Sequence, residues 1–487
     1  MKKLLLLSSL LIASTYTVFG QAEGSVVSAA ARGGVATTMT TDYHSIGINP
    51  ANLGLRTKYE TKNVTFGFLE MNASAFAKGV TTQQMKDFIF NGNSLTPDQK
   101  TQAAQSFASN NISGNMNLML VGIAIQSDKI GGIGFSINEI LNSNGNLSQN
   151  FTNFAFSGGL STQYFDSLRL SNGNKVPNDP NNYYLYNTIG IDSALSSQGV
   201  SMGTVFNGTN IKAHYYRTID ISYGREVFRN EILNISAGVG LKYAIGNYYM
   251  NVQSDGGVMK GNIADNPTFS SLSNVMNVPS SNNAANIITP LGHGFGFDLG
   301  VTAEFYDKLK VGASIVNIGS INYTSNTYKI VDTTIHAINY DASTADAFNE
   351  TVFWKESSSF KVKLPTKLRF GASLSLLEKR LEIGGDIIVP LNKEAGNINK
   401  TIIAVGGDFY VKRWFKVSSG ASIGGNYANS IDGYSTHVCI PAGVTFIAGE
   451  NAGWEVGLST KDIISLIDAN GKSPLYSIGL CVFRFRV

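Results

Sequence analysis

Residues 235–246 read ISAGVGLKYAIG, and this stretch decides the fold because two kinds of residue alternate along it. One set is apolar or aromatic: Ile235, Ala237, Val239, Leu241, Tyr243 and Ile245. The other is small or polar: Ser236, Gly238, Gly240, Lys242, Ala244 and Gly246. Successive side chains of a β-strand point to opposite faces, so the pattern predicts a strand with one apolar and one polar face.

The same two-residue period returns at 297–305, 367–376, 415–423 and 454–459. The stretches 232–252 and 360–378 are longer than most soluble strands, whereas a tilted membrane strand needs about 9–11 residues. The chain finishes on Phe483-Arg484-Phe485-Arg486-Val487, an alternating aromatic ending typical of outer-membrane barrels. We therefore predict an all-β fold, a closed antiparallel transmembrane β-barrel of about 14 strands, within a range of roughly 12 to 16. A soluble β-sandwich with its apolar faces inward is the alternative.

Composition excludes several other classes. The 487-residue chain has a net charge of +3, only 15% charged residues, and 51 glycines against 11 prolines. A near-balanced charge argues against a nucleic-acid partner. No run of about 18 apolar residues follows residue 20, which argues against a helical inner-membrane protein.

The first twenty residues have the form of a signal peptide. Lys2 and Lys3 precede the apolar stretch 4–13, and small or tolerated residues precede a cleavage point expected between Gly20 and Gln21. No cysteine follows this point, so no lipid anchor is expected. The sequence thus predicts export to the cell outer membrane, where lipid surrounds the wall.

Three regions are expected: a signal peptide at 1–20, an N-terminal segment at 21–60 and a barrel at 61–487. Residues 80–110 are expected to hold two short helices, and 461–468 another. The stretches 141–210, 264–292 and 326–358 are rich in polar residues or mixed, and are expected to form long loops.

The last strand breaks the pattern. Ile478, Leu480 and Val482 share the parity of Arg484 and Arg486 rather than that of the neighbouring phenylalanines. Either a β-bulge shifts the register, or the upper lumen is apolar at this strand.

Several short motifs occur in a recognisable order. They are Ala31-Arg32-Gly33-Gly34-Val35-Ala36, Asp42, Asn49-Pro50-Ala51-Asn52-Leu53-Gly54, Phe297-Asp298-Leu299-Gly300-Val301 with Leu309-Lys310-Val311-Gly312 and Asn317-Ile318-Gly319, Leu364-Pro365-Thr366-Lys367-Leu368-Arg369-Phe370-Gly371, and Gly457 to Asp462. From about residue 25 onward the chain resembles the FadL/PorV-like superfamily of outer-membrane barrels, and is most similar to its Bacteroidota branch. The long polar loops and the helical insert depart from the family pattern.

The resemblance implies a 14-stranded barrel whose lumen holds an N-terminal hatch. It also implies either of two activities. FadL-type members pass hydrophobic small molecules, and PorV-type members act with the cargo of type IX secretion. A hydrophobic ligand, or a secretion-system or surface protein, is therefore an expected partner.

Candidate site residues fall into two groups. The hatch motif is Asn49, Pro50 and Ala51, where proline fixes a turn. Charges expected to face the lumen, mostly in structural salt bridges, are Lys242, Asp298, Glu304, Lys310, Lys367, Arg369, Glu382, Asp386, Asp408, Lys416 and Glu455.

Catalytic and cofactor chemistry has little support in the sequence. The five histidines form no close pair, so no metal site and no cofactor is expected. The one Gly-x-Ser-x-Gly match, 420–424, lies inside an alternating strand, so it does not indicate a hydrolase. Cys439 and Cys481 are expected to be two unpaired thiols, although a bridge between them stays open.

Three functions remain: passage of a small hydrophobic molecule, an adaptor barrel for secretion or surface assembly, and a purely structural barrel. An enzyme is not expected.

Overall fold

The computed structural model describes residues 26–55, 63–81, 83, 102, 104–108, 110–127, 129–157, 161–266, 268, 278–279, 289–339, 352–425, 438–448, 453–468, 471 and 474–487. The expected signal peptide and most of the region 80–110, with its two expected helices, lie outside these residues.

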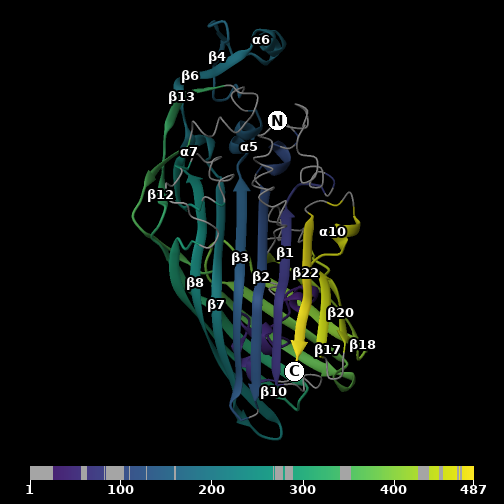
Figure 1. The fold of residues 1–487 in the computed structure, drawn as a ribbon. Helices are drawn as coiled ribbons and strands as arrows, with labels where there is room; N and C mark the ends of the chain where they lie inside the picture. Colours follow the sequence, from purple (N-terminus) through teal and green to yellow (C-terminus); the bar gives the residue numbers. More distant parts are fainter. Residues whose placement is uncertain are drawn as a thin grey trace.

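The main body is one sheet that closes on itself, with 14 strands in the ring (Figure 1). In ring order these are β1 (Val64–Ala77), β2 (Asn110–Ser127), β3 (Gly131–Leu147), β7 (Asn210–Arg229), β8 (Leu233–Asp255), β10 (Gly292–Phe305), β11 (Leu309–Tyr323), β15 with β16 (Phe360–Lys363 and Lys367–Leu376), β17 (Leu381–Pro390), β18 (Ile402–Lys412), β19 (Phe415–Ile423), β20 (Ala442–Ala448), β21 (Trp454–Thr460) and β22 (Leu475–Arg486).

Pairing of the first strand with the last closes the ring. β1 pairs with β22 from Thr65↔Arg486 to Phe76↔Leu475, and every pairing around the ring is antiparallel. Closure leaves no open sheet edge, which is what an apolar surrounding demands of a β-structure. The predicted fold class is confirmed.

The outer face of the wall is apolar. Leu241, Phe297 and Ile403 are each about half exposed, and their strand neighbours on the other parity, such as Lys242 and Asp298, are buried inside. This arrangement, apolar outside and polar inside, is typical of a transmembrane barrel. In the described part of the chain, no helix combines the length and the apolar character needed to cross a membrane.

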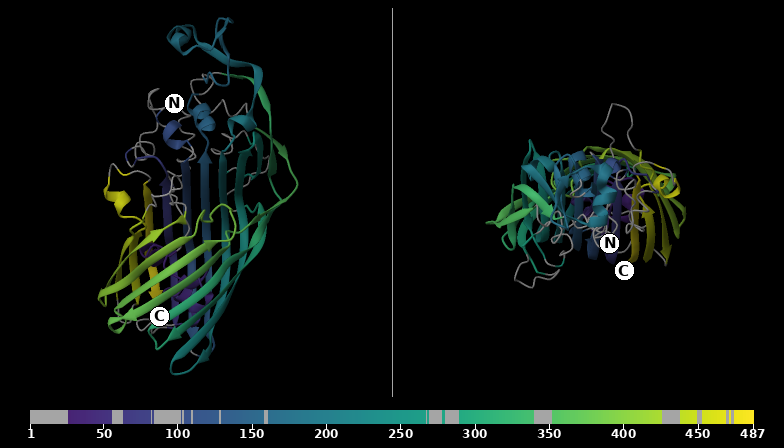
Figure 2. Two further views of the ribbon diagram at one scale, coloured as in Figure 1. Left: turned by 180° about the vertical axis from the view of Figure 1, so that it is seen from behind. Right: turned by 90° about the horizontal axis from the view of Figure 1, so that it is seen from above.

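The two ends of the barrel differ. At the end that holds the C-terminus, short segments such as 230–232, 306–308 and 377–380 join the strands, the last containing the 3-10 helix η6 (Leu377–Lys379). At the other end, called the upper end, the connections are long. β1, β2, β3, β7 and β8 form a tall wall, and the left view of Figure 2, seen from the opposite side, shows the shorter, tilted strands β16 to β18 in front of it.

The upper end carries more regular structure than expected. β9 (Val258–Ala264), β12 (Thr327–Val331) and β14 (Phe353–Glu356) continue the main sheet above β8. A separate sheet of β13 (Thr334–Asn339), β6 (Ile191–Ser201), β4 (Ser167–Leu170) and β5 (Lys175–Pro177) projects above it, and we call this sheet with its helices the cap (Figure 1). The helices nearby are α5 (Gln149–Ser157), η4 (Pro180–Asn182), α6 (Tyr183–Ile189) and α7 (Met202–Val205).

The expected loop boundaries are therefore wrong in two places. Residues 141–147 continue β3, which still pairs with β2 and β7 along this stretch. The strand was mistaken for a loop because Asn142, Asn144 and Asn146 stand where the usual lumen residues would be. Within 326–358, the described residues 326–339 and 352–358 contain three short strands where a loop was expected. For 264–292, the strands β9 and β10 end and begin where expected, and most of the residues between them lie outside the described ranges.

A bulge resolves the parity of the last strand. The pairing with β21 shifts between Glu455↔Arg484 and Gly457↔Cys481, so two residues of β22 oppose one of β21. Above the shift, Ile478 faces outward with 39% of its surface exposed, and Gly479 and Cys481 face inward. The apolar-lumen alternative is thus wrong. The expected helix at 461–468 is present but shorter, as α10 (Ile464–Ile467).

Candidate functional site: the closed lumen

Residues 26–55, which we call the N-terminal segment, lie inside the ring. The segment is built from α2 (Val27–Ala31) and the 3-10 helices η1 (Asp42–Ser45) and η2 (Pro50–Gly54). It contacts strands all around the wall, and almost all its side chains are buried. Its own apolar side chains, including Val26, Ala36 and Ile48, form a small core.

Glycines on the inner face make room for this segment. A Cβ atom on Gly238 would collide with the Pro50 carbonyl, and one on Gly300 would collide with the Asn49 side chain. The twelve strands that carry such glycines could not approach the segment so closely with larger residues. The glycines facing the segment, which we call the glycine collar, are Gly67, Gly122, Gly132, Gly134, Gly224, Gly238, Gly300, Gly312, Gly371, Gly384, Gly406, Gly443 and Gly457.

The Asn49-Pro50-Ala51 motif anchors one side of the segment. The Asn49 side chain accepts a hydrogen bond from the Ala51 N–H and donates to the Thr37 carbonyl and to Thr302 Oγ1, both at 2.9 Å. Thr302 Oγ1 in turn donates to Asn52 Oδ1 at 2.8 Å. Asparagine therefore fixes the turn at Pro50 and ties it to β10 with one side chain.

Two of the predicted lumen charges hold the opposite side. Asp386 Oδ2 accepts from the Ala36 N–H, the Thr37 N–H and Thr37 Oγ1 at 3.0, 2.9 and 2.6 Å. Arg369 Nη2 lies 3.1 Å from the same carboxylate oxygen and donates to the Gly34 carbonyl at 2.9 Å. Asp386 and Arg369 are therefore directed at the backbone of the segment.

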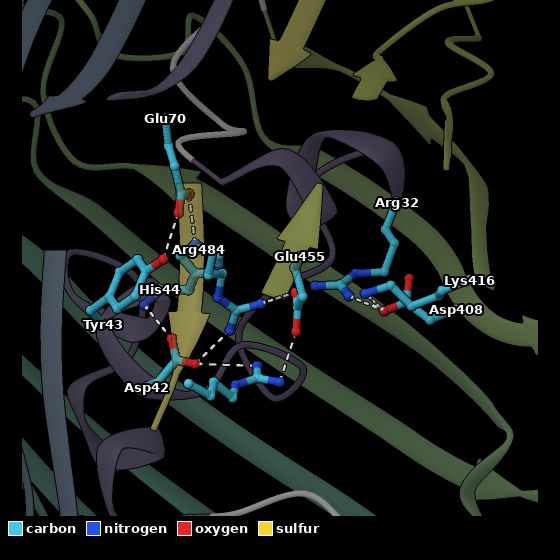
Figure 3. A network of polar contacts seen from close by, with 10 residues as sticks. Arg32, Asp42, Tyr43, His44, Glu70, Asp408, Lys416, Glu455 and Arg484 are labelled. Carbon is cyan, nitrogen blue, oxygen red and sulfur yellow. Dashed lines mark hydrogen bonds and ion pairs between the residues drawn. The ribbon is translucent and has the colours of Figure 1, made fainter. Parts of the chain in front are cut away.

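A third contact joins α2 to the far wall. Arg32 Nη1 lies 2.6 Å from Asp408 Oδ2, and Lys416 Nζ lies 3.5 Å from the same oxygen (Figure 3). Ser418 Oγ donates to the other oxygen at 2.6 Å. The guanidinium of Arg32 is 1% exposed, so this pair is held away from water.

The closing strands make the densest contact. Asp42 Oδ2 lies 2.5 Å from Arg484 Nη2 and 3.4 Å from Arg486 Nη2. Glu455 on β21 pairs with both arginines, at 2.7 Å to Arg486 Nη1 (Figure 3). Two carboxylates thus balance two guanidinium groups in a buried square. The inward turn of these arginines depends on the bulge in β22.

Beside this square, η1 contacts β1. Tyr43 OH donates to Glu70 Oε1 at 2.5 Å, and His44 Nε2 lies 2.7 Å from Glu70 Oε2. Leu69 has a φ of 54° and is 49% exposed, so the alternation of faces is interrupted there and Glu70 turns inward. The interruptions in β1 and β22 both place charges on the N-terminal segment.

A cavity of about 90 Å3 lies above the segment. Its floor includes Tyr43, His44 and Ile48, and its walls include β2, β3, β7 and β8. Lys242 reaches it and lies 3.2 Å from Asp220 Oδ1, 3.5 Å from Asp298 Oδ2 and 2.7 Å from Asn317 Oδ1. The other wall residues include the polar Asn117, Ser136, Asn138, Asn142 and Thr218, and also Met119, Ile140, Tyr216, Val316, Pro365, Lys367 and Arg369.

A loop from the far wall packs against Asn142, one of the residues that line this cavity. Residues 391–400, which we call the roof loop, join β17 to β18, and Gly396 lies directly against the Asn142 amide. The loop is tied down by Asn397, which donates to the Thr366 carbonyl at 2.9 Å. Its Ile398 packs with Val35 and Met39 of the N-terminal segment, so roof and floor share one apolar cluster.

The remaining sequence-predicted residues are accounted for as follows. Lys310 pairs with Glu382 at 3.3 Å, and Lys367 lies on the cavity wall. Glu304 is half-buried at the lower end of β10, away from the contacts described above. Cys439 and Cys481 are both buried free thiols. Within the described ranges, no group of His, Cys, Asp and Glu has the arrangement of a metal site.

Sequence reasoning missed several residues of the site. Arg32, Asp42 and Glu70 were not singled out as charge partners, and neither were Asp220 and Asn142. The inward parity of Asp220 within 216–224 could have revealed it. Glu70 follows the positive-φ residue Leu69 and Arg484 adjoins the bulge of β22, so a strict two-residue period could not place them.

The fold and its interior define a class: a closed antiparallel barrel whose lumen is filled from within by its own N-terminal segment. A family model described as a family of unknown function (DUF5723) matches residues 185–438, just over half of the chain, and the chain belongs to that family.

Solved structures similar to this chain include the Pseudomonas putida toluene transporter TodX, with 11% identity, a TM-score of 0.43 and coverage of 96% of this chain and 99% of that one. A TodX deletion mutant has a TM-score of 0.47 and 11% identity over 94% and 98% of the two chains. A Pseudomonas aeruginosa FadL homologue has a TM-score of 0.40 and 11% identity over 94% and 96%. No curated protein sequence matches the chain.

Proposed function

We propose that this protein is an outer-membrane channel for a small molecule and that its N-terminal segment is the hatch. One observation carries the proposal: inside an apolar-faced barrel, a cavity lies between the N-terminal segment and the inner face of the wall, and the roof loop packs against its lining residue Asn142. A purely structural barrel has no need of such a space, because packed side chains stabilise a lumen better than an enclosed cavity does.

The contacts of the segment suit a part that moves as a unit. The segment packs on itself through Val26, Ala29, Ala36 and Ile48, and the wall holds it through side-chain ion pairs and hydrogen bonds as well as apolar contacts. The ion pairs and hydrogen bonds can be exchanged for water when the segment shifts. Ile398 links the roof loop to it, so movement of one disturbs the other.

The resemblance to FadL-type barrels makes a hydrophobic small molecule one candidate solute for the proposed channel. The parity of Ile478 and Leu480 does not provide an apolar path through the lumen. Ile478 lies on the outer side of the wall, and Leu480 shares its parity on β22. The channel proposal does not depend on which cargo passes.

A reversible lock tests the hatch. A Cβ on Gly312 would lie 3.1 Å from Thr38 Cγ2, within reach of a disulfide, and Thr38 Oγ1 forms no hydrogen bond that would be lost. In Thr38→Cys/Gly312→Cys proteoliposomes, we expect oxidation to lower the flux of a permeant solute at least tenfold and reduction to restore it.

The panel of solutes is erythritol, toluene and a long-chain fatty acid, and each single-cysteine variant serves as a control. If no solute crosses reduced protein faster than protein-free vesicles, the channel proposal fails. If flux persists unchanged in the oxidised variant, the segment is not the hatch.

The cap favours a second function, an adaptor barrel that binds a secretion or surface protein. On α6, Tyr184 is 75% exposed and Leu185 is 47% exposed, at the outermost part of the molecule (Figure 1). We expect a partner retained in native membranes to be lost from Tyr184→Ser/Leu185→Ser but kept by Tyr306→Ser at the lower rim. Recovery of the barrel alone from native membranes would contradict this function.

A further inference from the structure

We infer that the cavity above the N-terminal segment binds a small, uncharged, hydroxyl-rich molecule, a polyol or a small sugar. This inference rests on the proposed channel function and names the class of solute that the channel admits.

The charges around the cavity already have partners. Lys242 is shared by Asp220 and Asp298, Arg369 is paired with Asp386, and Glu70 is held by His44 and Tyr43. A charged ligand would have to separate one of these pairs, and removing one partner from a buried ion pair is costly. The cavity therefore favours an uncharged occupant.

The neutral amides, in contrast, are left unsatisfied. Asn142 is 1% exposed, lines the cavity, and neither its Nδ2 nor its Oδ1 forms a hydrogen bond. The Tyr216 hydroxyl approaches it without acceptable hydrogen-bond geometry. Asn117 Oδ1, on the neighbouring strand, is also unpartnered. Buried polar groups are rarely left in this state, and each exception calls for a partner.

A hydroxyl group can satisfy an unpartnered donor and an unpartnered acceptor together. It can accept from Asn142 Nδ2 and donate to Asn142 Oδ1 or Asn117 Oδ1. Ser136, Asn138 and Thr218 extend the same polar wall on β3 and β7. A hydrocarbon would leave the Asn142 amide and Asn117 Oδ1 dry and unpaired, which is unfavourable.

The floor offers the complementary surface. The ring of Tyr43 and the side chains of Ile46 and Ile48 line the lower side of the cavity. A polyol carries C–H groups on the side opposite its hydroxyls, so it can lie on the apolar floor and bond to the amide wall. Several water molecules would also fit the volume, at about 10–15 Å3 each, so water is the competitor that the experiment must exclude.

The test measures erythritol binding to the detergent-solubilised full-length barrel by isothermal titration, with toluene and sodium sulfate as the other probes. We expect erythritol alone to bind. In Asn142→Leu, which removes the amide and fills the space, we expect binding at least tenfold weaker. Asn144→Leu, on the same face of β3 but outside the cavity, is the matched control and should bind as the parent does.

Folding is checked for each variant by heat-modifiable gel migration, and Asn142→Ser gives a smaller change that keeps one hydroxyl. We expect its affinity for erythritol to lie between those of the parent and Asn142→Leu. Erythritol binding that is equal in all four proteins, or absent from the parent, would overturn the inference.

Flux through the reduced Thr38→Cys/Gly312→Cys protein separates this inference from the channel proposal. Faster flux of erythritol than of toluene supports both. Flux of toluene or fatty acid without erythritol keeps the channel and overturns the polar-solute inference, whereas no flux at all ends the channel proposal while titration still decides the binding site.

Discussion

The floor and the roof of the cavity are held by different chemistry. The floor is fixed by buried carboxylate–guanidinium pairs, with Asp42 and Arg32 each facing the opposite charge on the wall. The roof loop is held mainly by neutral side-chain hydrogen bonds and by Ile398, with one further bond from Lys212 Nζ to the Lys393 carbonyl. Buried ion pairs demand their geometry more strictly than apolar and neutral contacts do. On the proposed channel function, we therefore expect the roof loop to move more readily than the N-terminal segment.

The largest expected effect comes from breaking the floor. Asp42→Ala leaves Arg484 and Arg486 with Glu455 alone, so we expect a loss of about 4 kcal/mol in the free energy of unfolding. Faster hydrogen exchange in residues 26–55 and urea unfolding in micelles measure it. Asp255→Ala, at an exposed carboxylate, is the control. Equal exchange in both variants would show that the ion pairs do not fix the floor.

The roof should respond somewhat less. Ile398→Ala removes a side chain that is 2% exposed from the cluster with Val35 and Met39, and we expect a loss of about 3 kcal/mol. Exchange should rise in residues 391–400 more than in 26–55. Leu391→Ala, where the side chain is 48% exposed, should change little. A larger rise in the N-terminal segment than in the loop would reverse the order of opening.

The glycine collar should be sensitive to one methyl group. Gly238→Ala places a Cβ against the Pro50 carbonyl, so we expect a loss of about 2 kcal/mol and a shifted N-terminal segment. Gly145→Ala is the matched control, because the nearest atom to its Cβ, the Asn210 carbonyl oxygen, is 3.7 Å away. Protease accessibility of residues 26–55 reports the shift. Identical digestion of the two variants would contradict the close packing of floor against wall.

The smallest expected effect concerns Asp166, a charged residue of the cap that lies far from both the N-terminal segment and the roof loop. Hydrogen bonds from Ser197 and Ser167 lower the pKa of Asp166, in the cap, to about 2. Because this pKa is depressed, its stabilising contribution is complete above the ordinary value of about 3.9 and is lost as the pH falls through about 2. We expect Ser197→Ala to raise the pKa of Asp166, measured by carboxyl-carbon NMR. A titration curve that does not move would show that the Ser197 hydroxyl is not the cause, since the Ser197 N–H still donates to Asp166 in this variant.

Much of the wall could be predicted because two-residue periods are local. Residues 235–246 fix their own faces, and the structure places Leu241 outside and Lys242 inside as the pattern requires. Strand β3 past residue 141 was missed because Asn142, Asn144 and Asn146 give it no apolar contrast. A bulge is a single extra residue, so in β22 it showed only as broken parity.

The site was less accessible to the sequence. Asn49 and Pro50 mark a turn by their own chemistry, and Lys242, Asp298, Arg369, Asp386 and Asp408 share the parity of the lumen. Their partners could not be read from sequence, since Arg32 and Asp408 lie 376 residues apart and meet only when the ring closes. The cavity depends on how the roof loop folds back, which no periodic pattern records.

The seam between β1 and β22 has a consequence for assembly. Asp42 grips Arg484 and Arg486 on one side of it, and its neighbours Tyr43 and His44 grip Glu70 on the other. The N-terminal segment, which is synthesised early, therefore binds the last strand at the β1–β22 pairing that closes the barrel. If the barrel closed without the N-terminal segment inside, Arg484, Arg486 and Glu70 would lack their contacts to Asp42, Tyr43 and His44. Closure of the ring and insertion of the segment therefore depend on the same ion pairs and hydrogen bonds.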